Sequence, residues 1–283
     1  MTGRGPIATT GATGAVGGRV ARRLADAGAE QVLVVRDPSR APELPRATVA
    51  RAAYDDARAV RAALEGVPVA LLVSASEHPR RVDLHRTFVD AAVAAGVEHV
   101  VYLSFLGAAP DATFTFARDH WATEEHLRAS GLRWTALRDS TYADFFPLMV
   151  GEDGALRGPA GDGRVAPVAQ DDVADALTAV LLDPGAHVGR TYDLTGPEAL
   201  SYAQIAAELT EALGRPVRYE QETVDEAYAS RAPYGVERWE VDGWVSTYTA
   251  VARGEMDVVS GDVERLTGHR PRSLAEVLRA RRP

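Results

Sequence analysis

The stretch Thr10–Gly18, which reads TGATGAVGG, decides the fold that we expect for this chain. Two apolar residues at 7–8 precede it as a short strand, and Val16, Val20 and Leu24 follow at the spacing of one helix face. A glycine-rich turn between a strand and a helix binds the pyrophosphate of a dinucleotide, because the N-terminal amides of the helix face the anion. The sequence therefore predicts a dinucleotide-binding domain.

Each glycine of this turn has a predicted role. Gly11 permits the tight turn, Gly14 lets the backbone approach the diphosphate, and Gly17 lets the helix pack against the strand. A glycine turn without a ligand is the alternative, but a further strand at 31–35, at the expected distance, favours the binding loop. The remaining residues of the predicted phosphate loop are Ala12, Thr13, Ala15 and Val16.

Composition excludes several classes of protein. The 283 residues are 46% hydrophobic, which is enough for a full core, and the net charge of −9 argues against nucleic-acid or anionic-membrane binding. There are no cysteines, and the seven histidines are scattered without metal-ligand spacing, so we expect no metal. Residues 1–30 lack the long apolar run of a signal peptide, and no segment approaches ~20 apolar residues, so we expect neither a leader nor a membrane span. We expect a cytoplasmic monomer or homodimer.

Strand-like and helix-like segments alternate over residues 6–137. Strands are predicted at 31–35, 69–73, 99–103 and 134–137, and a helix with a buried Val82, Val89 and Val93 stripe is predicted to end at Gly96. This pattern is typical of an α/β doubly wound parallel sheet, the Rossmann fold. We expect an NAD(P)-binding domain at 1–146 and a smaller, mainly substrate-binding lobe at 147–283, with segments that return to the Rossmann core.

Two capping boxes, Ser201 with Gln204 and Ser273 with Glu276, indicate ordered helices in that C-terminal half.

The end of the second strand predicts the nucleotide that is bound. In such folds an acidic residue there holds the ribose 2′-hydroxyl, whereas an arginine accommodates a 2′-phosphate. Arg36 occupies the position and Arg40 lies nearby, so NADP(H) is favoured; adjacent Asp37 keeps NAD(H) possible. We expect further cofactor contacts from Tyr54 and Asp55, which end a predicted third strand near the expected place of the adenine. Ser74, Ala75 and Ser76, which follow the fourth strand at 69–73, are expected to contact the ribose and nicotinamide.

The chain resembles a known family at several of these segments. TGATGAVGG, VVRDP at 34–38, LLVSAS at 71–76 and VVYLSFLGA at 100–108 are similar to the NmrA-like atypical short-chain dehydrogenases/reductases. The segments ASEHPRRVDLHR and DHWATEEHLRASGLRWTALRDSTY further resemble NAD(P)H:quinone oxidoreductases and triphenylmethane dye reductases. The resemblance covers most of the chain and implies an NAD(P)H-dependent oxidoreductase.

One departure from the wider superfamily bears on mechanism. Typical members use Tyr-x-x-x-Lys, in which the tyrosine transfers a proton and the lysine lowers its pKa. Phe116 and His120 stand at those positions, and all 31 basic residues counted as Lys or Arg are arginines. Ser104 resembles the serine of the usual set and is a candidate donor to a substrate carbonyl or a cofactor contact. His120 is a candidate ribose contact or proton donor, with a helix-surface histidine as the alternative.

Hydride transfer to an acceptor whose reduced anion is already stable suits a site without a strong acid. The hypothesis is an NADPH-dependent reductase of a quinone or polycyclic aromatic, such as an aromatic polyketide intermediate reduced before oxygenation. The alternative is a non-catalytic, NAD(P)-binding redox sensor of NmrA type; a nucleotide-sugar isomerase is disfavoured by Phe116 and His120. Aromatic residues near the ends of the fifth and sixth strands predict the substrate contacts: Phe105, Phe114, Trp121, Tyr142, Phe145 and Phe146.

Overall fold

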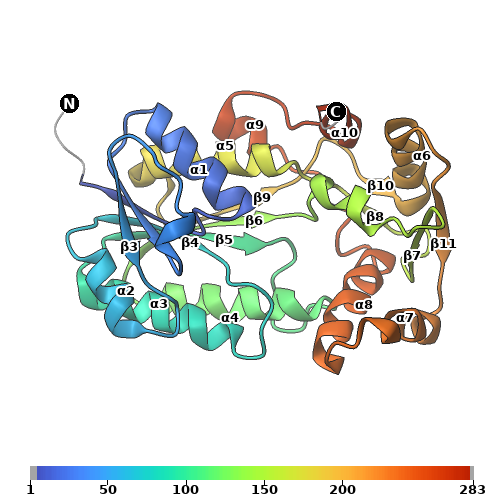
Figure 1. Ribbon diagram of the computed structural model, residues 1–283, viewed down its shortest axis with the longest axis horizontal. Helices are drawn as coiled ribbons and strands as arrows, with labels where there is room; N and C mark the ends of the chain where they lie inside the picture. The colour runs from blue at the N-terminus through green and yellow to red at the C-terminus, as the bar shows by residue number, and fades with distance from the viewer. Residues whose placement is uncertain (1–4, 281–283) are drawn as a thin grey trace. The chain divides into compact units, whose positions relative to one another are not determined.

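The computed structural model describes residues 5–280 and divides them into two compact units (Figure 1). The first unit comprises the chain up to residue 104 together with 119–138 and 173–192. The second comprises 105–118, 139–172 and the chain from 193 onward. The chain therefore enters each unit more than once, and the boundary predicted at residue 146 stays a prediction.

A seven-stranded sheet is the centre of the first unit, with the order β3-β2-β1-β4-β5-β6-β9. The ladders that join β1 to β2 and β4, β2 to β3, and β4 to β5 are parallel. This is the Rossmann strand order, and the chain reverses direction across the sheet between β1 and β4. The doubly wound fold is thus confirmed. The strands are β1 Ile7–Thr10, β2 Gln31–Val35, β3 Ala47–Arg51, β4 Val69–Val73, β5 His99–Phe105, β6 Arg133–Asp139 and β9 Arg190–Leu194.

Helices cover both faces of this sheet. α1 (Ala15–Asp26) and α5 (Gln170–Leu182) lie on one side, and α2 (Ala57–Leu64), α3 (Arg81–Ala95) and α4 (Thr115–Ala129) lie on the other (Figure 1). Short 3-10 turns at η1 (Pro38–Arg40) and η3 (Pro184–His187) join the elements. Large apolar side chains fill the space between the layers, and the fully buried ones include Leu72, Phe88, Tyr102 and Leu127.

Helix α3 ends at Gly96 as predicted, with a left-handed φ of 78°, but its buried face differs from the prediction. Val93 is 45% exposed, whereas Arg81, His85 and Phe88 are buried together with Val89. A stripe defined by valines misses this face because two of its members are polar. The buried side of α3 is therefore partly a hydrogen-bonding surface.

The second unit contains two small sheets and a set of helices around its own core. β7 (Ala155–Gly158) pairs in parallel with β11 (Arg218–Gln221), and β8 (Arg164–Val165) pairs antiparallel with β10 (Leu200–Ser201). Both predicted capping boxes form. The helices are η2 Ala143–Met149, α6 Tyr202–Leu213, α7 Val224–Arg231, η4 Ala232–Tyr234, α8 Arg238–Ala252, α9 Asp262–Thr267 and α10 Leu274–Ala280.

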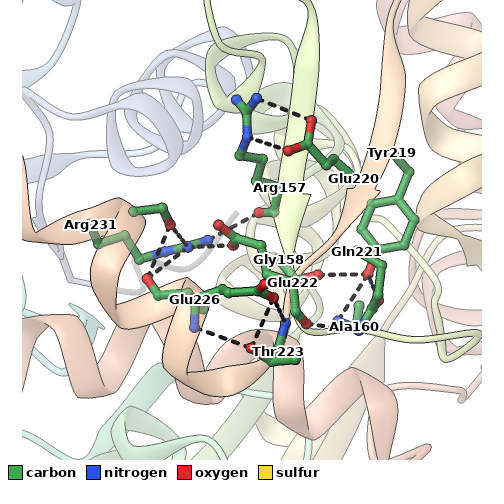
Figure 2. Close-up of polar contacts among 12 residues, drawn as sticks. Arg157, Gly158, Ala160, Tyr219, Glu220, Gln221, Glu222, Thr223, Glu226 and Arg231 are labelled. Carbon is green, nitrogen blue, oxygen red and sulfur yellow. Dashed lines mark hydrogen bonds and ion pairs between the residues drawn. The ribbon is translucent and has the colours of Figure 1, made fainter.

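A buried arginine joins three segments of this second unit (Figure 2). Arg231, at the end of α7, donates to the Glu222 carboxylate over 2.8 Å and to the carbonyl oxygen of Arg157 over 3.0 Å. Its guanidinium also lies 5.2 Å from the centre of the Tyr248 ring on α8. The contact therefore ties the β7–β11 pair to α7 and α8.

Over residues 5–280, every helix is too short or too polar to cross a bilayer.

Candidate functional site

The glycine turn after β1 has the close packing that the sequence predicts. Gly11 adopts a φ of +65°, and a Cβ built on it would meet Val73 of β4 at 3.1 Å. A Cβ on Gly17 would lie 2.3 Å from the carbonyl oxygen of Gly11, which is closer than any real contact. Only glycine lets α1 start this close to the turn that precedes it.

The same turn leaves the N-terminus of α1 open. Gly14 is the N-cap residue and has no side chain to cap the helix, and the first turn of α1 contains no acidic residue. Thr13, Gly14 and Ala15 are exposed, while the side chains of Ala12 and Val16 are buried and anchor the loop. Main-chain amides at a helix N-terminus attract an anion. The residues present thus fit the pyrophosphate of a dinucleotide.

Thr10 fastens this turn to the neighbouring strand. Its Oγ1 donates to the carbonyl oxygen of Leu71 over 2.9 Å and accepts from the N–H of Val73 over 2.8 Å. The carboxyl ends of β1 and β4 are therefore joined at the point where the strand order reverses. Ligands of open α/β sheets bind at this point.

The end of β2 carries a group of arginines. Arg36, Arg40 and Arg51 are exposed, and Arg51 is the residue paired with Val35 across the β2–β3 ladder. The carboxylate of Asp37 accepts from both the N–H and the hydroxyl of Ser39, and these hydrogen bonds lower its pKa, with further help from Arg40 and Arg51. The Asp37 carboxylate thus caps η1. The exposed charged groups that remain at the end of β2 are the guanidinium groups of Arg36, Arg40 and Arg51.

Tyr54 and Asp55, predicted near the adenine, lie in the connection between β3 and α2. The Tyr54 hydroxyl donates to the carbonyl oxygen of Val73 over 2.8 Å, and its ring packs edge-on against Phe88 at 5.3 Å. Burial raises the pKa of Tyr54, so its phenol stays protonated. Asp55 is exposed.

Beyond β4, Ser74, Ala75 and Ser76 form a partly exposed loop above a buried polar network. The N–H of Ala75 donates to His85 and its carbonyl oxygen accepts from Arg81. The loop is therefore held from α3, an element that the sequence analysis did not connect with the cofactor.

Ser104, at the end of β5, is fully buried and donates its hydroxyl hydrogen to the Glu124 carboxylate over 2.6 Å. Arg138 contacts both carboxylate oxygens of Glu124, at 2.8 and 2.7 Å, and Arg128 contacts one of them at 2.7 Å. A hydroxyl has one hydrogen to donate, and here Glu124 receives it. To donate to a substrate carbonyl or to the cofactor, the Ser104 hydroxyl would have to rotate away from Glu124. Its catalytic role and its cofactor contact both stay predictions.

His120 is 4% exposed, so the alternative of a surface histidine does not hold. Its Nε2 lies 3.1 Å from Nη2 of Arg81, and its Nδ1 lies 2.9 Å from the Tyr102 hydroxyl. Burial, and then the positive charge of Arg81, lower the pKa of His120 well below its usual value. The ring is therefore neutral near pH 7, which weakens the proton-donor role.

Phe116 stands where relatives with the usual dyad carry tyrosine. Its ring occupies the space next to Gly243 of α8, where an added Cβ would lie 2.3 Å away. It packs edge-on against Phe114 at 5.6 Å and Trp239 at 6.0 Å. Phe116 is thus a packing residue of the second unit and has no group that transfers a proton.

The six predicted substrate residues fall into separate places. Phe105 and Phe114 pack together at 4.9 Å in the second unit, and Tyr142 packs on Phe145 at 5.3 Å. Phe146 is fully buried and packs edge-on against Tyr202. Trp121 belongs to the first unit and lies 5.4 Å from the Arg128 guanidinium. The substrate contacts stay predictions for all six residues.

Sequence reasoning missed four polar residues of the first unit: Arg51, Arg81, His85 and Glu124. Arg51 could have been found from its place at the end of a strand next to β2. The buried face of α3 could have been found from helical spacing, which places Arg81, His85, Phe88 and Ala92 on one side of the helix. A pattern that counts only apolar residues does not include the first two.

The sheet order and the open glycine turn define the class of this protein as a Rossmann-type dinucleotide-binding protein. Residues 11–184 match the family described as NAD(P)H-binding. The chain belongs to this NAD(P)H-binding family.

Three relatives are similar over most of the chain. Quinone oxidoreductase 2 of Escherichia coli is 34% identical over 278 residues, 95% of this chain and 96% of that protein. A structure of the NADPH-dependent quinone oxidoreductase QOR2 from that organism, complexed with NADPH, has a TM-score of 0.88 at 33% identity and covers 96% of this chain and 98% of its own.

The (4-alkanoyl-5-oxo-2,5-dihydrofuran-3-yl)methyl phosphate reductase of Streptomyces griseus is 39% identical over 225 residues, 78% of each chain. The Citrobacter triphenylmethane reductase complexed with NADP(H) has a TM-score of 0.86 at 28% identity and covers 97% of this chain and 99% of its own. The predicted family resemblance and the predicted class, an NAD(P)H-dependent oxidoreductase, are confirmed.

Proposed function

We propose that this protein is an NADPH-dependent reductase that delivers hydride to a quinone or a similar flat, conjugated acceptor. The observation that carries the proposal is an intact dinucleotide turn in a chain that has Phe116 and His120 at the positions of the usual tyrosine and lysine. A bound dihydronicotinamide supplies the hydride. An acceptor whose reduced anion is delocalised takes its proton from water, so no strong acid is required of the protein.

The group of arginines at the end of β2 supports NADPH over NADH. A 2′-phosphate adds negative charge beside the adenine ribose, and guanidinium groups bind phosphate through paired, charge-assisted hydrogen bonds. Arg36, Arg40 and Arg51 offer three such groups, whereas the carboxylate of Asp37 is already engaged by Ser39. A carboxylate that binds the ribose 2′-hydroxyl would favour NADH, but the Asp37 carboxylate caps η1 instead.

In this proposal the chain binds and orients rather than exchanging protons. Holding the acceptor against the hydride donor in a reactive geometry contributes several kcal/mol, on the order of the gains seen in intramolecular reactions. The names of the relatives support the acceptor class, since a quinone, a triphenylmethane dye and an oxo-dihydrofuran all contain an electron-poor conjugated system. An aromatic polyketide acceptor, the cytoplasmic location and the oligomeric state stay predictions.

The test is NADPH oxidation by the purified protein against a panel of benzoquinones, naphthoquinones and anthraquinones, with NADH in parallel. We expect turnover with NADPH, and we expect Arg36→Leu to raise the KM for NADPH ~10- to 100-fold, the range for a lost charge-assisted contact, without affecting NADH. Arg61→Leu, an exposed substitution on α2, is the matched control. Absence of turnover with every acceptor would refute the reductase.

The redox sensor is the second candidate, because loss of the tyrosine–lysine pair also suits a protein that binds NAD(P) without turnover. Calorimetry separates the two: a sensor binds NADP+ tightly and oxidises NADPH with none of the acceptors. Failure of both NADPH and NADH to bind would exclude both candidates.

A further inference from the structure

The loop after β4 is held by two polar side chains of α3. The N–H of Ala75 donates to Nε2 of His85 over 2.8 Å, and Nε of Arg81 donates to the carbonyl oxygen of Ala75 over 2.8 Å. Arg81 is 6% exposed and His85 is fully buried. One residue of the loop is therefore fixed at both its donor and its acceptor.

The hydrogen bonds of His85 determine its tautomer. Because Nε2 accepts from Ala75, a neutral ring carries its hydrogen on Nδ1, which faces Oγ1 of Thr123 at 2.8 Å. Thr123 in turn donates to the carbonyl oxygen of Asp119 over 2.8 Å. Burial, together with the charge of Arg81, lowers the pKa of His85 to about 3, which keeps the acceptor available.

Arg81 extends the network to two more elements. Its Nη2 lies 3.1 Å from Nε2 of His120, and because a guanidinium only donates, the histidine nitrogen accepts. His120 then directs Nδ1 to the Tyr102 hydroxyl of β5 at 2.9 Å. The loop is thus connected through α3 to both α4 and β5.

Buried polar side chains at these two positions of α3 stabilise the fold less than apolar side chains would. Burial of a cation and an imidazole carries a desolvation penalty that apolar residues would avoid. What they supply here is a fixed orientation of the Ala75 main chain at the carboxyl end of β4. In the Rossmann fold the second mononucleotide lies over the half of the sheet that begins with β4.

We propose that Arg81 and His85 are positioning residues that hold the Ala75 main chain for the nicotinamide half of the cofactor. The proposal rests on the proposed function, since it takes NADP(H) as the ligand. Its prediction is a selective one: loss of either side chain weakens ligands that reach over β4 and spares ligands that end at the adenosine half.

The experiment compares two ligands by calorimetry: NADP+, and adenosine 2′,5′-bisphosphate, which lacks the nicotinamide half. We expect His85→Leu to weaken NADP+ ~10-fold, the equivalent of one buried hydrogen bond, and to leave the bisphosphate within about twofold. His85→Gln restores NADP+ binding to within about threefold, because the amide oxygen can accept from Ala75. Arg81→Leu shows the same selective loss.

Arg86→Leu is the control, because Arg86 lies on the same helix with its side chain 49% exposed. Equal losses of both ligands, or unchanged NADP+ binding in His85→Leu and Arg81→Leu, would overturn the proposal. If His85→Leu does not fold, Arg81→Leu and Arg81→Gln with the same two ligands decide it, because loss of the Arg81 guanidinium also releases the carbonyl oxygen of Ala75. Failure of the wild-type protein to bind either ligand would instead refute the proposed function.

Discussion

At the scale of single residues, Gly17 is the position where the turn tolerates no change. A Cβ there would approach the carbonyl oxygens of Gly11 and Thr10 to 2.3 and 2.8 Å. Both atoms belong to the main chain, so no side-chain rotation relieves the contact. We expect Gly17→Ala to lower the free energy of unfolding by ~1–3 kcal/mol, as overpacked sites do, and to weaken NADPH binding at least tenfold.

Urea denaturation and calorimetry measure the two effects. Gly185→Ala is the control, because a Cβ on Gly185 meets nothing within 4 Å and should change stability by less than about 0.5 kcal/mol. Full NADPH affinity in Gly17→Ala would show that α1 can move back without disturbing the phosphate loop.

At the scale of elements, the buried arginine of the second unit illustrates how a short sheet is held. The β7–β11 pair has few residues, and Arg231 links it to α7 through Glu222 (Figure 2). The side chains of Arg231 and Glu222 are 10% and 7% exposed. Removing one partner leaves the other charge buried, so we expect Arg231→Leu to cost ~3–5 kcal/mol in the free energy of unfolding.

The matched control is Arg270→Leu, which removes the ion pair with Glu276 on α10. The Arg270 side chain is 70% exposed, so this loss should cost less than about 1 kcal/mol. Urea titrations of both variants give the comparison. Similar stabilities for the two would mean that Arg231 contributes no more than a surface charge.

At the scale of the whole molecule, three buried histidines predict sensitivity to acid. Burial lowers the pKa of His85 to about 3 and that of His99 to about 4, and the pKa of His120 also lies well below its usual value. In the unfolded chain the three titrate near 6.5. Below that pH the unfolded state binds more protons than the folded state, so stability decreases as the pH falls.

Between pH 7.5 and 5.5 the unfolded state binds on average about half a proton more per histidine than the folded state, which corresponds to ~1.4 kcal/mol each, so the free energy of unfolding should be up to ~4 kcal/mol lower at pH 5.5 than at pH 7.5. Urea denaturation at the two pH values measures the difference. His99→Gln should reduce the slope by about a third, because that group no longer titrates. An unchanged or higher stability at pH 5.5 would contradict the depressed pKa values.

Local patterns in the chain were sufficient for the elements that depend on neighbours in sequence. The glycine turn, the strands at 31–35 and 69–73 and the end of α3 at Gly96 all follow from spacing and residue type. The valine stripe of α3 was wrong at Val93, because a hydrophobic pattern cannot recognise a buried face made partly of arginine and histidine. Burial in a core cluster, as found for Phe146, is likewise not visible to a pattern of aromatic residues near strand ends.

By itself, the sequence determined that a dinucleotide turn is present and that the usual tyrosine and lysine are missing, because both are statements about which residue stands where. The tertiary structure alone decided what surrounds that turn. Arg81 and His85 of α3 and His120 of α4 form one polar network beneath the loop after β4. The Asp37 carboxylate caps η1, and Arg51 lies opposite Val35, the residue before Arg36, in the β2–β3 ladder. Such partners depend on how the helices and strands pack, since a buried polar group must find its hydrogen bond from whichever element lies next to it in space.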